Sequence, residues 1–188
     1  LLILMICAVA FSQIPDRRIV AEWEPALGTM IRWPLGIPSD LVIELANDDL
    51  LYVLVETNNQ QSQALDDFNN WGVNSDNVVF INTDTYSHWT RDYGPQFIIG
   101  EDYWKVVNQY FNGYPEENGC QENLFTDNNN AEGRPLPYEI RGWEDDDGTN
   151  IDFANQMNWE VLNLPLYLKG GNFMTDGYGT GFSTQLMI

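Results

Sequence analysis

Short apolar runs alternate with segments of mixed polarity along most of the chain. The runs have the length and the β-branched content of strands, and we expect strands at 29–33, 50–56, 77–82, 96–99, 103–107 and 161–168. Between the first three runs, residues 39–48 and 58–71 have apolar side chains at helical spacing. This alternation predicts an α/β fold in which helices connect parallel strands.

The same pattern predicts how these elements are bounded and buried. The run 50–56 is almost entirely apolar, which is typical of a strand covered on both faces. We expect Ser39 to cap the first helix, Asn58 or Asn59 to cap the second, and Gly72 to end the second. The expected buried faces comprise Leu41, Ile43 and Leu45 in the first helix and Ala64, Leu65, Phe68 and Trp71 in the second.

The second half of the chain is less regular. Residues 96–107 read as one hairpin and residues 172–184 as another, turning at Gly177-Tyr-Gly179. Between them, residues 108–149 are rich in Asn, Glu, Gly and Pro without a clear period, which predicts a long surface loop. A short helix should follow, with Thr149 as its cap, Asp152 as the capping-box partner, and Ile151, Phe153, Ala154 and Met157 as its apolar residues.

The most concentrated chemistry lies in His88-Trp-Thr-Arg-Asp-Tyr-Gly-Pro95, which we expect to be a strand-end loop. Loops after strands of α/β folds border the crevice where ligands bind, so Trp89, Arg91 and Asp92 are candidate site residues. A carboxylate can bind a guanidinium through two parallel hydrogen bonds while an aromatic ring stacks on it, which Asp92 and Trp89 allow. The alternatives are that Arg91 and Asp92 neutralise each other on the surface and that Trp89 anchors the core.

The run Trp89-Thr-Arg-Asp-Tyr-Gly-Pro95 resembles the signature of the guanidino-group hydrolases that include agmatine deiminase and the Porphyromonas-type peptidylarginine deiminases. Four more stretches agree with that family in the same order: 21–25, 30–34, 170–177 and 179–184. The resemblance implies the pentein fold, an α/β propeller of five modules, with about the first half in this chain. It also implies that Asp92 is a catalytic residue that grips the substrate guanidinium, that Trp89 packs on the same group, and that no cofactor or metal is needed.

By resemblance, the reaction is hydrolysis of a guanidinium to a urea with release of ammonia, through a cysteine nucleophile and a histidine. Neither catalytic group is identifiable in this chain. Cys120 has Glu116, Glu117 and Glu122 around it, which favour the thiol over the thiolate, and His88 matches no family histidine. We therefore expect residues 13–188 to be the N-terminal part of a deiminase domain and to be inactive alone.

The resemblance leaves two substrates open, peptidyl-arginine and agmatine, the second of which leads to putrescine. Lys169 stands where agmatine deiminases have a glutamate, and a cation there is unhelpful to a cationic substrate, so either Lys169 points elsewhere or the substrate differs from agmatine. The stretch Asn172-Phe-Met-Thr-Asp176 and the apolar run at the start of the chain look more like the exported peptidylarginine type, so we favour conversion of peptidyl-arginine to citrulline. Arg134 and Arg141 are weaker candidates for binding the carboxylate of such a substrate, and the alternative for both is a solvated loop charge.

The first residues suggest export. Leu1–Phe11 is an apolar run too short to span a membrane, and Ala10-Phe11-Ser12 suits signal peptidase. We expect residues 1–12 to be a truncated bacterial-type signal peptide of a secreted or periplasmic protein that has no membrane association after cleavage. The alternative is a buried first strand in a cytoplasmic protein.

The formal charge of −20, with eight Lys and Arg residues in all, argues against a nucleic-acid partner. An acidic field favours cationic ligands, although runs such as Glu144–Asp147 are also explained by a solvated acidic surface. Two other classes of function remain open. One is a secreted module that binds cationic groups and catalyses no reaction, and the other is a calcium-stabilised surface protein built around residues 144–152. The spacing of that acidic segment does not satisfy the EF-hand pattern.

Overall fold

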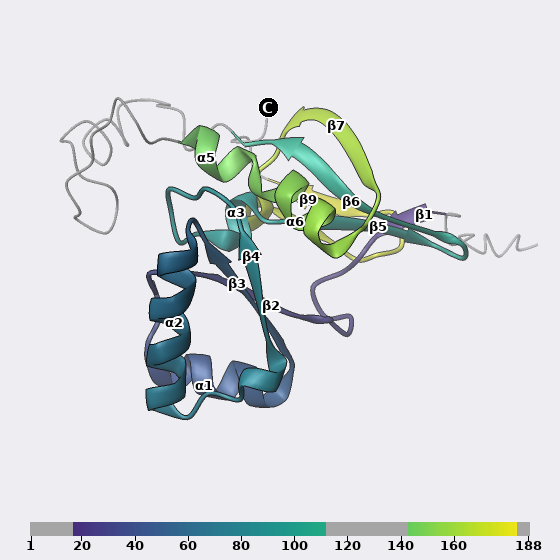
Figure 1. Ribbon diagram of the computed structural model, residues 1–188. Coiled ribbons are helices and arrows are strands. Elements are labelled where there is room, and N and C mark those ends of the chain that lie inside the picture. The colour runs from purple at the N-terminus through teal and green to yellow at the C-terminus, as the bar shows by residue number, and fades with distance from the viewer. Residues whose placement is uncertain (1–16, 112–142, 184–188) are drawn as a thin grey trace, which may run out of the picture.

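The computed structural model describes residues 17–111 and 143–183 (Figure 1). The expected signal peptide, Cys120, Arg134 and Arg141 lie outside these residues, so those expectations stay predictions. The described strands form three sheets, with strand orders β1-β5-β6-β7, β2-β3-β4 and β8-β9. Within the described residues, no helix has the length and apolar content needed to cross a membrane.

The three-stranded sheet β2-β3-β4 is parallel throughout, as the alternating pattern predicts. It contains β2 (Gly28–Arg32), β3 (Leu50–Val55) and β4 (Val78–Asn82), with β3 in the centre. The crossovers contain α1 (Ser39–Asp48) and α2 (Asn58–Trp71), and a short 3₁₀ turn, η1 (Ser75–Asn77), precedes β4. Figure 1 shows α2 to the left of this sheet and α1 at the bottom of the view.

The central strand β3 is apolar throughout because both of its faces are buried. Leu51, Val53 and Val55 belong to one core, which they share with α1 and α2. Tyr52 and Leu54 point to the opposite face and belong to a second core. The second core also contains Tyr93, Val106 and Phe153, so it joins this sheet to the remainder of the molecule.

The second sheet is mixed. It contains β1 (Arg17–Ile19), β5 (Gln96–Gly100), β6 (Tyr103–Tyr110) and β7 (Val161–Tyr167). The β5–β6 hairpin is confirmed, and β7 runs parallel to β6 after a crossover that includes α5 (Trp143–Asp147) and α6 (Thr149–Met157).

The expectation of a loop over all of residues 108–149 is wrong at both ends. Strand β6 continues to Tyr110, and the acidic run at 143–147 forms helix α5. Val106 and Val107 of β6 are buried, and Asp146 of α5 is buried as well. Tertiary packing therefore orders segments whose composition alone is typical of a loop.

Several expected caps and buried positions are also corrected. Ser39 and Thr149 are the first residues of their helices, neither helix has a side-chain cap, and the capping oxygen of α2 belongs to Thr57. Gly72 does end α2, with a left-handed φ of 78°. Leu41, Leu65 and Ile151 are exposed, because the helices present neighbouring side chains to the core: Val42 and Ala46, Ala64 and Phe68, and Phe153 and Ala154.

Two short elements from distant parts of the chain meet beside the second core. The expected strand-end loop at 88–95 contains a one-turn helix, α3 (Thr90–Tyr93). Helix α3 contacts η2 (Gly170–Asn172), the turn that precedes the expected hairpin of β8 (Phe173–Thr175) and β9 (Gly181–Ser183).

Candidate functional site

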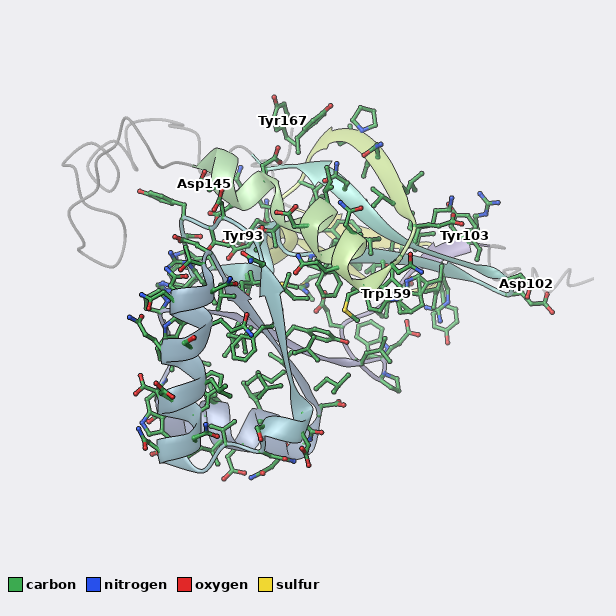
Figure 2. All side chains as sticks on the ribbon, in the orientation of Figure 1. Tyr93, Asp102, Tyr103, Asp145, Trp159 and Tyr167 are labelled. Carbon is green, nitrogen blue, oxygen red and sulfur yellow. The ribbon has the colours of Figure 1, made fainter. Side chains whose placement is uncertain are left out.

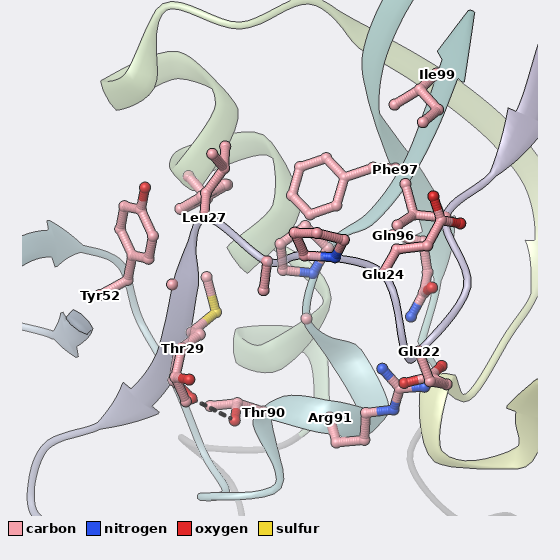
Figure 3. Close-up of a pocket in the computed structure, with 18 of the residues that line it drawn as sticks. Glu22, Glu24, Leu27, Thr29, Tyr52, Thr90, Arg91, Gln96, Phe97 and Ile99 are labelled. Atoms are coloured by element: carbon pink, nitrogen blue, oxygen red, sulfur yellow. Dashed lines mark hydrogen bonds and ion pairs between the residues drawn. The ribbon is translucent and has the colours of Figure 1, made fainter. Parts of the chain in front are cut away.

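Helix α3 carries the candidate site and is anchored at both ends. The Thr90 hydroxyl donates to the carbonyl of Met30 in β2, at 3.0 Å (Figure 3). The Tyr93 ring is fully buried in the second core, and its hydroxyl donates to the carbonyl of Ser87 at 2.9 Å (Figure 2). A single helical turn has little stability of its own, so these tertiary contacts fix its position.

Asp92 is held by the backbone of η2. Its Oδ1 accepts a hydrogen bond from the Gly171 amide at 3.2 Å, and no other hydrogen bond reaches the carboxylate from the described residues. Burial raises the pKa of Asp92, while the Gly171 amide and the charges of Lys169 and Arg91 lower it to a smaller extent. Asp92 is therefore a half-buried carboxylate with acceptor capacity to spare for a cationic ligand.

The two glycines of η2 allow this contact. A Cβ atom on Gly171 would lie 2.2 Å from Oδ1 of Asp92, and one on Gly170 would lie 2.2 Å from the carbonyl oxygen of Arg91. Either methyl group would overlap helix α3. The glycine pair and the Trp-Thr-Arg-Asp run, which the sequence places far apart, thus form one structural unit.

Arg91 does not neutralise Asp92 in an ion pair. Its Nη2 pairs with Oε1 of Glu22, in the segment between β1 and β2 (Figure 3). That segment is held in turn by a two-bonded ion pair between Arg18 and Glu24, at 2.5 and 2.7 Å. The alternative of a self-neutralising surface pair is therefore wrong, because Arg91 pairs with a different carboxylate.

Trp89 lies at the N-terminus of α3 and is 47% exposed. Its ring packs against His88, with centroids 4.6 Å apart. Trp89 directly precedes α3 as its N-cap residue and lies three positions before Asp92 in the sequence. The alternative role for Trp89, a core anchor, is not what the structure shows, since nearly half of the side chain is accessible.

A cavity of about 590 Å³ lies on another side of α3 (Figure 3). Its lining includes Thr90 and Arg91 but neither Trp89 nor Asp92. Most of the wall is apolar and aromatic, including Met30, Phe97 and Trp159. This cavity is therefore distinct from the candidate site, because Trp89 and Asp92 do not line it.

The segment between β4 and α3 is held by buried polar residues that our reasoning from the sequence missed. Asp146 of α5 accepts hydrogen bonds from the amides of Tyr86 and Ser87 at 2.8 and 3.2 Å, and from the Ser87 hydroxyl at 3.0 Å. Burial raises the pKa of Asp146 to about 7, against the opposing effects of these hydrogen bonds and of Arg32.

Arg32 holds the same segment from the β2 side. Its Nε donates to the Thr85 hydroxyl at 2.7 Å, and its Nη2 donates to the Thr85 carbonyl and to Glu56, both at 3.2 Å. Arg32 lies within residues 30–34, one of the stretches that carry the family resemblance. That resemblance was the feature of the sequence that could have pointed to Arg32. Asp146 had no such signal, because it is embedded in an acidic run typical of a solvated surface.

The acidic segment around α5 uses its carboxylates within the protein. Besides Asp146, Asp147 accepts from the amide of Phe111, and Asp152 accepts from the Thr83 hydroxyl at 2.8 Å. Within residues 17–111 and 143–183, no cluster of three or more His, Cys, Asp or Glu residues is placed to hold a metal ion.

Lys169 is buried close to Asp92, on which its charge acts.

Comparison with known proteins gives both a family match and structural matches. The model of the Porphyromonas-type peptidyl-arginine deiminase family matches residues 18–188. The agmatine deiminase of Enterococcus faecalis is 20% identical with a TM-score of 0.63, over 92% of this chain and 44% of that protein. The C. jejuni agmatine deiminase is 16% identical with a TM-score of 0.60, over 90% of this chain and 46% of that protein.

A variant of the C. jejuni enzyme, in which serine replaces a cysteine, was solved with substrate bound and is also similar, with a TM-score of 0.61 and 16% identity over 88% of this chain and 44% of that protein. At these identities the likeness shows a shared α/β fold. The chain spans less than half the length of these solved structures.

Proposed function

We propose that this chain, which belongs to the Porphyromonas-type peptidyl-arginine deiminase family, supplies the guanidinium-binding side of the active site of a guanidino-group hydrolase. The observation that carries the proposal is the position of Asp92. Its carboxylate is fixed by the Gly171 amide, is not paired with Arg91, and lies three residues after the exposed Trp89. These are the groups that a flat, cationic guanidinium requires.

The chemistry of the whole enzyme follows from this binding mode. Water converts the bound guanidinium to a urea and releases ammonia, so one C–N bond is broken and one C–O bond is formed. Asp92 contributes by holding the guanidinium in one orientation for attack, since positioning removes much of the entropic cost of the reaction. We propose that the nucleophile and the proton-transfer groups lie elsewhere in the complete protein.

We propose peptidyl-arginine as the substrate in preference to agmatine. The description of the family whose model matches this chain supports this choice. Ammonia release from an arginine-containing peptide and from agmatine, compared in the full-length protein, decides between the two substrates.

We also propose that the described sheets are the first modules of a five-module propeller. Large apolar side chains that are exposed in β7, β8 and β9 support this arrangement, because exposed apolar surface often marks a contact with further structure: Leu166, Tyr167, Met174 and Phe182.

We propose export as well, with cleavage near Ser12-Gln13, and amino-terminal sequencing of secreted protein tests it.

The test of the proposed function is Asp92→Asn in the full-length protein. The amide oxygen can still accept from Gly171, but the amide nitrogen adds a donor where the guanidinium offers only donors. Bonds to charged groups contribute about 1.5–3 kcal/mol each, so we expect kcat/KM for ammonia release to fall by at least about tenfold. The melting temperature should change little.

Asp102→Asn is the matched control, since Asp102 is an exposed carboxylate at the turn of the β5–β6 hairpin (Figure 2). It should leave both activity and stability unchanged. An Asp92→Asn protein that melts much earlier but retains normal kcat/KM would show that Asp92 only braces the turn.

A further inference from the structure

The polar groups of Ser87 connect the buried carboxylate of Asp146 to both ends of helix α3. Ser87 is 2% exposed. Its amide and its hydroxyl both donate to Asp146, at 3.2 and 3.0 Å. Its hydroxyl oxygen accepts from the amide of Trp89 at 3.4 Å, and its carbonyl accepts from the hydroxyl of Tyr93 at 2.9 Å.

These contacts leave Ser87 little freedom. A hydroxyl has one donor and two acceptor sites, so the Ser87 hydroxyl can donate to Asp146 and accept from Trp89 at the same time. Trp89 is the N-cap residue of α3 and Tyr93 is its last residue, with Asp92 between them. Ser87 thus contacts the helix on both sides of the candidate guanidinium-binding carboxylate.

From this geometry we infer that Ser87, fixed by Asp146, is a positioning residue that sets the orientation of Trp89 and of helix α3 for substrate binding. The role rests on the proposed function and extends it to residues that do not touch substrate. The segment between β4 and α3 needs hydrogen bonds from other elements to fix its position, because residues 83–89 form neither helix nor strand. Its hydrogen bonds to α5 substitute for the regular pairing that would otherwise fix its path.

The test variant is Ser87→Ala, which removes the hydroxyl and keeps the backbone contacts to Asp146 and Tyr93. Thr83→Val is the matched control. Thr83 is also buried, also donates its hydroxyl to a carboxylate of the α5–α6 region, and lies in the same segment, but it has no contact with Trp89. Ser87→Ala loses the hydroxyl contacts with Asp146 and the Trp89 amide, and Thr83→Val loses those with Asp152 and the Asp84 carbonyl, so their stability losses should be similar.

The first readout does not depend on activity. The full-length protein is labelled with 5-fluorotryptophan, and the ¹⁹F resonance of Trp89 is assigned from its loss in Trp89→Phe. We expect this resonance to shift in Ser87→Ala and to stay in place in Thr83→Val. A Trp89 resonance that is unchanged in Ser87→Ala, or that moves equally in both variants, overturns the inference.

The second readout is kcat/KM for ammonia release from an arginine-containing peptide. Misplacement of a binding group by about 1 Å can cost about 100-fold, so we expect a loss of at least about tenfold in Ser87→Ala and less than about twofold in Thr83→Val. Equal losses in the two variants overturn the inference. A wild-type protein without deiminase activity refutes the proposed function, and the ¹⁹F resonance then decides the positioning role alone.

Discussion

At the scale of single residues, the candidate site depends on the lack of a side chain at Gly171 as much as on the carboxylate of Asp92. Asp92 accepts from the Gly171 amide because no Cβ atom separates them, and a Cβ atom there would lie 2.2 Å from the carboxylate oxygen. Since Asp92 belongs to a turn anchored by Thr90 and Tyr93, the carboxylate rather than the helix should give way.

We therefore predict that Gly171→Ala lowers kcat/KM of the full-length protein by at least about tenfold, since the displaced carboxylate loses a charge-assisted hydrogen bond. Gly148→Ala is the control, because a Cβ atom on Gly148 has its nearest neighbour at an ordinary 3.7 Å. Steady-state assays of ammonia release measure the effect. Activity equal to that of the Gly148 variant would contradict the role assigned to Gly171.

At the scale of elements, the helices around the two cores are oriented by contacts that periodicity alone does not specify. In α2, Ala64 and Phe68 are fully buried, whereas Leu65 is 39% exposed. The Phe68 ring packs edge-on against Trp33 and is stacked near Phe80, at centroid distances of 5.7 and 6.4 Å. Phe68 thus fixes α2 against Trp33, which directly follows the edge strand β2, and against Phe80 of the other edge strand, β4.

Phe68→Ala should therefore lower the free energy of unfolding by about 3–5 kcal/mol, the usual cost of removing a buried aromatic ring. Leu65→Ala, in the same helix, should cost no more than about 1 kcal/mol because much of that side chain already contacts water. Urea unfolding curves of the two variants compare the losses directly. Similar losses would mean that α2 is rotated relative to the arrangement described.

Helices α5 and α6 are also positioned by tertiary contacts, in their case with the segment that leads to α3. Gln156 exchanges hydrogen bonds with the backbone of Asn82, Asp152 binds Thr83, and Asp146 binds Tyr86 and Ser87. The carboxylates of this acidic region thus have a structural role, because they accept hydrogen bonds from amides and hydroxyls.

The raised pKa of Asp146 makes this element sensitive to pH. An unfolded aspartate ionises near its ordinary pKa of 3.8, while folded Asp146 keeps its proton up to about pH 7. Between these values the folded state binds more protons, so the contribution of Asp146 to stability falls as pH rises. Asp146→Asn retains an acceptor for the amides and does not titrate.

We predict that wild type loses melting temperature relative to Asp146→Asn between pH 5 and pH 8, by several degrees, since about 1 kcal/mol corresponds to roughly 2–4 °C in a domain of this size. Asp102→Asn should give a difference that does not depend on pH over that range. Parallel pH profiles for wild type and Asp146→Asn would show that Asp146 is ionised throughout.

At the scale of the whole molecule, the chain spans less than half the length of the solved structures it matches. The described residues place Trp89 and Asp92, the groups that we propose bind a guanidinium, close together in sequence at α3, while the only histidine, His88, packs on Trp89. We predict that the 188-residue chain alone releases no ammonia from agmatine or from an arginine peptide, whereas the full-length protein does. Ammonia release by the purified chain above a blank would contradict this.

The sequence by itself determined the features that depend on neighbouring residues along the chain. Apolar periodicity predicted the parallel β2–β4 unit with its helices, both hairpins, and the left-handed end of α2 at Gly72, because strand and helix periods and glycine conformations are local properties. The composition of the Trp-Thr-Arg-Asp run and its family resemblance singled out Trp89 and Asp92.

Only the tertiary structure decided which partners those residues have. Gly171 is 79 positions from Asp92, Glu22 is 69 from Arg91, and Asp146 is 59 from Ser87. Local propensity carries no information on such pairs, and the buried Asp146 has the same chemical identity as the half-buried Asp145 and Asp147 beside it. Burial and hydrogen bonding between distant segments use Asp146 to hold the segment before α3, and they pair Arg91 with Glu22 and Asp92 with the Gly171 amide.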